Sequence, residues 1–148
     1  MQLPDSYCSD PASTHRDPVA ELGLAGLAAV ADARALAIRV IDPDGKGRED
    51  HWQKGAQSLL TGMILYVLHK AREGGPPATL TQIGAELTNS HRDTHALWAD
   101  MLAMKDVNPV IVEAGNDMRD RPNEERGAIV AIVHSLVVRC RNARGSDS

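Results

Sequence analysis

The sequence predicts an all-α fold, a compact bundle of about six helices joined by short loops. Apolar residues recur with the helical period in several segments, and Gly, Pro, Asn and Asp separate those segments. Aromatic residues make up only 3% of the chain and Phe is absent, which disfavours a β-sheet core. With 148 residues, the chain has the length of one domain.

The first helical pattern covers residues 24–41, is rich in Ala, and ends at the turn-forming sequence Asp42-Pro43-Asp44-Gly45. Residues 1–17 before it are polar and contain two prolines, so we expect an extended or mobile lead-in. The domain itself is expected to span residues 18–142.

The second helix has the most regular pattern. Asp50 is the expected N-cap, and Gly74-Gly75-Pro76-Pro77 is the expected end. An apolar stripe at helical spacing predicts its buried face, which comprises Trp52, Ala56, Leu59, Leu60, Met63, Ile64, Val67 and Leu68.

Three shorter helices are expected between residues 79 and 118. Thr79 and Gln82 form a capping-box pattern, in which Thr79 caps an early amide and Gln82 reaches back. A largely apolar segment follows at 93–105, and Asn108-Pro109 then restarts helix with Asn as the cap.

The last helix is expected over residues 123–142, followed by a disordered tail at 143–148. Many of its residues are β-branched, which keeps a strand as an alternative. Glutamates at its start and arginines at its end match the helix dipole and favour helix. Its predicted inner face comprises Ile129, Ile132, Val133, Leu136, Val137 and Cys140.

Charge and composition disfavour several classes of protein. The net charge of −4 disfavours DNA binding over the whole surface, since phosphate contacts need a basic excess. The arginines of the last third either are solvated or contact DNA or acidic partners; acidic residues interleaved with them favour solvation. The longest apolar run is too short to cross a bilayer, so we expect no direct membrane contact.

The sequence indicates no catalytic or metal site, and we expect no cofactor. Residues 42–53 fail as a calcium loop because Lys46 and Gln53 stand where oxygen and Glu ligands are needed. No nucleotide-binding loop occurs. His91 and His95 lie four residues apart, but two ligands do not make a zinc site. We therefore expect that the chain by itself is not an enzyme.

The segment 29–71 resembles the all-alpha domain of the conjugative coupling proteins of type IV secretion systems. In that family a helix ends in Val-Asp-Pro-Asp-Gly, His-Trp or Phe-Trp follows, and then Ala-x-x-Leu-Leu-x-x-x-Ile-Leu-x-Val-Leu. Here these residues are Ile41 to Gly45, His51-Trp52, and the apolar series from Ala56 to Leu68. Asp42, Pro43, Asp44, Gly45 and Trp52 are thus expected to be structural residues of the motif.

The resemblance implies a role in a larger machine. In the family, this domain is inserted into a hexameric ATPase that is anchored at the cytoplasmic face of the bacterial inner membrane. The implied function is recognition of substrates, which are relaxase or relaxosome proteins and secreted effector proteins, and their presentation to the motor. The implied neighbours are the ATPase domain and adjacent hexamer subunits.

Polar residues of the short helices are our candidates for partner binding. An acidic surface suits partners with basic signals. The alternative function is direct DNA binding through a helix-turn-helix-like pair formed by the third and fourth helices. The candidate contact residues are Arg92, Asp93, His95, Glu113 and Asp117.

Overall fold

A computed structural model describes residues 18–20, 30–42, 51–88 and 94–145 of the chain. Every regular element in these segments is a helix, so the all-α prediction is confirmed. The helices, which follow a short helical stretch at 18–20, are α3 (Val30–Ile41), α4 (His51–Arg72), α5 (Leu80–Leu87), α6 (Thr94–Leu102), α7 (Pro109–Asp120) and α8 (Asn123–Gly145).

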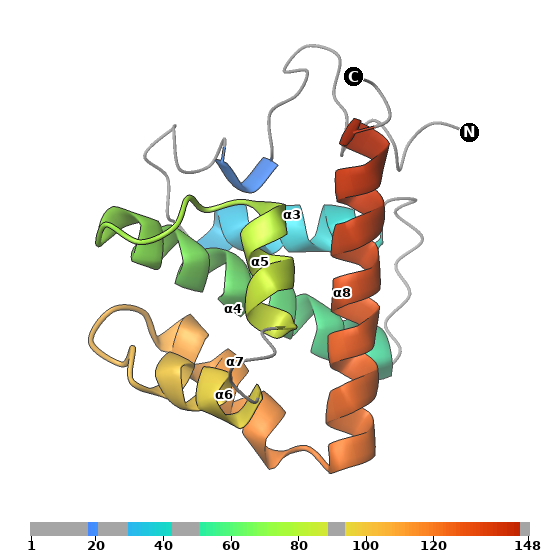
Figure 1. Cartoon of the computed structure of the whole chain (residues 1–148). Coiled ribbons are helices and arrows are strands. Elements are labelled where there is room, and N and C mark those ends of the chain that lie inside the picture. The colour runs from blue at the N-terminus through green and yellow to red at the C-terminus, as the bar shows by residue number, and fades with distance from the viewer. Residues whose placement is uncertain (1–17, 21–29, 43–50, 89–93, 146–148) are drawn as a thin grey trace.

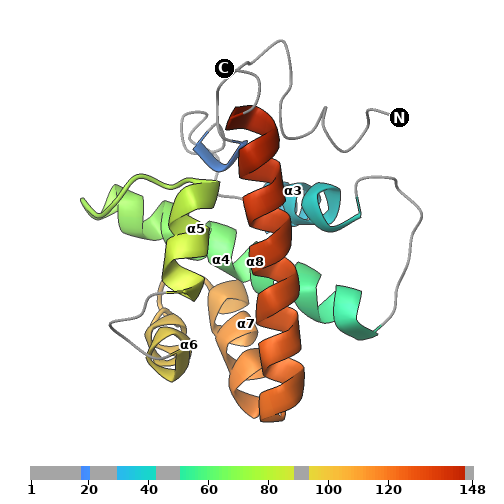
Figure 2. The same ribbon diagram turned by 45° about the vertical axis from the view of Figure 1, so that its right-hand side comes forward.

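Helix α4 is the centre of the bundle. It packs against α3 along one side and against α7 along another, while α8 crosses it, as two views of the molecule show (Figures 1 and 2). Helix α5 packs mainly against α8, and α6 packs mainly against α7. The two longest helices therefore cross, and the shorter ones fill the spaces beside them.

The predicted stripe of α4 is wider than expected, because every residue from Leu59 to Leu68 is buried. A helix that is buried on all sides belongs in the middle of a core rather than on its surface. Trp52 was predicted to begin the buried stripe, but this prediction is wrong because Trp52 is 41% exposed. It lies in the first turn of α4, beyond the part of the helix that its neighbours enclose.

Gly62 permits a very close approach of α4 and α7. A Cβ atom at Gly62 would lie 2.4 Å from the Cβ of Ala114 on α7. Carbon atoms in contact are normally about 3.5–4.0 Å apart. The spacing of these two helices therefore depends on the absence of a side chain at position 62.

Several predicted helix ends are confirmed by their hydrogen bonds. The Thr79 hydroxyl accepts from the Gln82 amide at 3.0 Å, although the Gln82 side chain donates to Glu86 instead of reaching back. The Asn108 side chain accepts from the Val110 amide at 2.9 Å. Gly74 ends α4 with a φ of +88°, a left-handed conformation that favours glycine.

Three helices end elsewhere than predicted. Helix α7 ends at Asp120 instead of residue 118. Helix α6 stops at Leu102 instead of residue 105, and turns continue to Val107, where the amide donates to the Met104 carbonyl at 2.9 Å. Hydrogen bonds between residues three apart often form at the end of a helix, and here they precede Asn108, the N-cap of the next helix. Helix α8 continues to Gly145, three residues past its predicted end, and the strand alternative for this segment is wrong.

A polar network joins the end of α4 to α5. Lys70 donates to the buried Glu86 at 3.1 Å and to the Tyr66 hydroxyl at 3.5 Å. Burial raises the pKa of Tyr66 above its ordinary 10.0, against the opposing attraction of Lys70. Burial alone would lower the pKa of Lys70, but its hydrogen bond with Glu86 and its partners' charges raise it above 10.5.

Candidate partner-binding site

A polar cleft of about 290 Å³ lies where α3, α4 and α7 meet. We call it the α3–α4–α7 cleft, and we call the side of it that α4 lines its floor and the sides that α3 and α7 line its walls. It is lined by Arg34 from α3, Lys54, Gln57, Ser58 and Thr61 from α4, and Val110 and Glu113 from α7.

The floor is a polar stripe on the helix that otherwise forms the core. Lys54, Gln57, Ser58 and Thr61 follow the spacing i, i+3, i+4, i+7, so they share one face of α4. The Thr61 hydroxyl is buried and donates to the Gln57 carbonyl at 2.7 Å. Lys54 and Ser58 are exposed residues at the cleft, and their side chains carry hydrogen-bond donors.

The α7 wall is fixed at its start by a strong cap. Asn108 holds the Val110 amide, and Pro109 has its φ preset at the first helical position, so the backbone that carries Glu113 begins at a defined point. The close approach of Gly62 and Ala114 sets the distance between this wall and the floor. The cleft is therefore a preformed feature of the packed helices.

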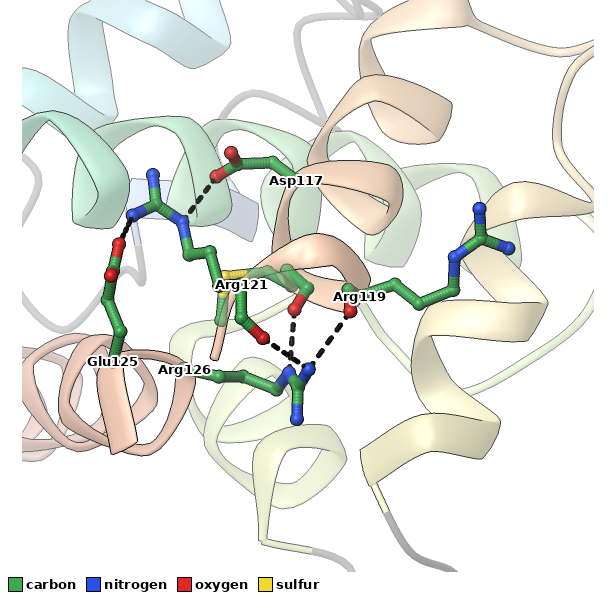
Figure 3. A network of polar contacts seen from close by, with 6 residues as sticks. Asp117, Arg119, Arg121, Glu125 and Arg126 are labelled. Carbon is green, nitrogen blue, oxygen red and sulfur yellow. Dashed lines mark hydrogen bonds and ion pairs between the residues drawn. The ribbon is translucent and has the colours of Figure 1, made fainter. Parts of the chain in front are cut away.

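The far end of α7 is held by two arginines at the corner between α7 and α8, which we call the α7–α8 corner (Figure 3). Arg121 donates to Asp117 at 3.0 Å and also pairs with Glu125. Burial alone would lower the pKa of Arg121, but its bonds to these two carboxylates raise the pKa above its ordinary value. Arg121 thus links the last turn of α7 to the first turn of α8.

Arg126 caps the end of α7 with its side chain. The buried guanidinium donates to the carbonyls of Met118 at 2.6 Å, Arg119 at 2.9 Å and Arg121 at 2.6 Å (Figure 3). The last carbonyls of a helix have no partner within it, and these bonds supply partners. The prediction that the C-terminal arginines are solvated is wrong for Arg126, which is buried and stabilises the α7–α8 corner.

The sequence profile of one family, described as type IV secretory system conjugative DNA transfer, matches residues 2–139. The chain belongs to this family. It is similar to a conjugal transfer protein TraG of Escherichia coli, with 39% identity over 141 residues that cover 88% of this chain and 22% of TraG. A second Escherichia coli TraG is 38% identical over 152 residues, covering 93% of the chain and 24% of that protein.

This member of the conjugative DNA transfer family spans less than a quarter of the length of those two relatives. No solved structure matches the chain. No helix in the described segments is long and apolar enough to cross a membrane. The same segments hold no group of three or more His, Cys, Asp and Glu residues that a metal ion would need.

The structure separates the predicted contact residues. Glu113 lines the α3–α4–α7 cleft, whereas His95 is exposed on α6 and does not line it. Asp117 lies one turn after Glu113, and its carboxylate is bonded to Arg121 in the α7–α8 corner. Arg92 and Asp93 lie outside the described residues. Of the three that lie in the described part of the chain, Glu113 alone lines the cleft.

Two of the five family-motif residues, Asp42 and Trp52, belong to the described part of the chain. Asp42 directly follows α3, is half-buried, and donates its amide to the Ile38 carbonyl at 2.7 Å. Trp52 is the second residue of α4, and Pro43, Asp44 and Gly45 lie outside the described residues. Sequence reasoning missed all the other lining residues of the cleft, which are Arg34, Lys54, Gln57, Ser58, Thr61 and Val110. For the four on α4, the polar stripe on an otherwise apolar helix was a usable signal.

Proposed function

We propose that this chain is the substrate-recognition domain of a type IV secretion coupling protein. It binds relaxase or relaxosome proteins, or secreted effector proteins, and presents them to a hexameric ATPase motor formed by other parts of the polypeptide. In this proposal the whole protein is held at the cytoplasmic face of the bacterial inner membrane, and the adaptor itself performs no chemistry.

The observation that carries the proposal is the preformed polar cleft at the junction of α3, α4 and α7. The close packing of α4 and α7 and the Asn108 cap fix the α7 wall against the floor, so binding a partner there requires little ordering of these two helices. The family supports the setting, since the two TraG relatives are named as conjugal transfer proteins and are more than four times as long.

Direct DNA binding by a helix-turn-helix-like pair gains no specific support from the packing. Helices α5 and α6, which would form that pair, pack chiefly against α8 and α7 rather than against each other. The net charge of −4 also opposes contact with a phosphate backbone. Nucleic-acid binding is therefore the alternative that the affinity-capture experiment must distinguish from protein binding.

The test is affinity capture with the 148-residue chain as bait, in nuclease-treated and untreated lysates of cells that carry the same transfer system. Mass spectrometry should find the relaxase, a relaxosome protein or an effector enriched over an unrelated helical domain of equal net charge, and nuclease should not remove it. Recovery of nucleic acid without these proteins would contradict the proposal and favour the DNA-binding alternative.

A further inference from the structure

We draw no further inference here: the strongest candidate, the uncharged outward face of helix α8 with the exposed residues Gly127, Ala131 and Ser135, is a stripe of small residues, and nothing in the described part of the chain shows what covers it.

Discussion

Replacing Gly62 with Ala should destabilise the fold by about 2 kcal/mol, although Ala is the better helix former. Within α4, the change gains about 1 kcal/mol of helix propensity. The added Cβ, however, would lie 2.4 Å from the Cβ of Ala114, more than 1 Å inside the normal contact distance of about 3.5 Å. Ala114 has no rotatable side chain, so α4 and α7 must move apart.

The magnitude follows from these two opposing effects. Adding a methyl group to a tightly packed core usually costs about 1–3 kcal/mol, and a contact that cannot relax by rotation belongs at the upper end of that range. Subtracting the gain in propensity leaves the net loss of about 2 kcal/mol. The loss should be measured as the free energy of unfolding in urea, followed by circular dichroism at 222 nm.

Gly127→Ala is the matched control. Gly127 lies in α8 and is exposed, and a Cβ there would meet no atom within 4 Å. The same substitution should therefore stabilise the chain by up to about 1 kcal/mol. In the Gly62→Ala background, Ala114→Gly should be neutral or stabilising because it removes the other methyl group, whereas by itself it should cost about 1 kcal/mol.

The reasoning would be refuted if Gly62→Ala were as stable as Gly127→Ala. Unfolding must give the same dependence on urea concentration in all variants, so that the midpoints report stability alone. If Ala114→Gly were equally costly in both backgrounds, the two positions would not be in contact, and the spacing of α4 and α7 described above would be wrong.

Three further outcomes are expected. Arg126→Lys should cost about 2–3 kcal/mol in urea unfolding, because an ammonium cannot reach all of the α7 carbonyls that the guanidinium binds. Stability should fall as pH rises past about 10, since folding raises the pKa of Tyr66 and Lys70 above 10.0 and 10.5 and the unfolded chain releases these protons first. In single-tryptophan variants, iodide should quench Trp52 fluorescence strongly and the fully buried Trp98 weakly.

Each of these outcomes has a contrary result. An unchanged midpoint for Arg126→Lys would show that the cap contributes little to stability. Alkaline unfolding should be shallower in Tyr66→Phe and Lys70→Met, and an identical pH profile would assign it to other groups. Equal quenching of the two tryptophans would contradict the exposure of Trp52.

Local signals in the sequence predict most of the helix ends, because caps and breakers act within a few residues. Thr79, Asn108 and Gly74 each make the interaction that their position in the sequence indicates. The end of α6 was misplaced because the apolar pattern runs on to Met104, while the backbone has already tightened into turns before the Asn108 cap.

Features that depend on several helices at once cannot be predicted from local sequence signals. The periodic pattern of α4 predicts a buried face but not burial on all sides, which follows from the packing of α3, α5, α7 and α8 around it. Arg126 has the composition of a surface residue, and only the geometry of the α7–α8 corner brings its guanidinium to the end of α7. The cleft combines residues far apart in the chain, and of its lining residues only Glu113 was singled out.

The position of the cleft floor on the central helix has an evolutionary consequence. Thr61 is buried in the core and also lines the cleft, so a substitution there acts on both and few changes are tolerated. Arg34 and Glu113 are exposed, and most exchanges at such positions leave folding intact. Under the proposed function, divergence of cargo preference among related transfer systems is therefore expected at these two wall positions rather than at Thr61.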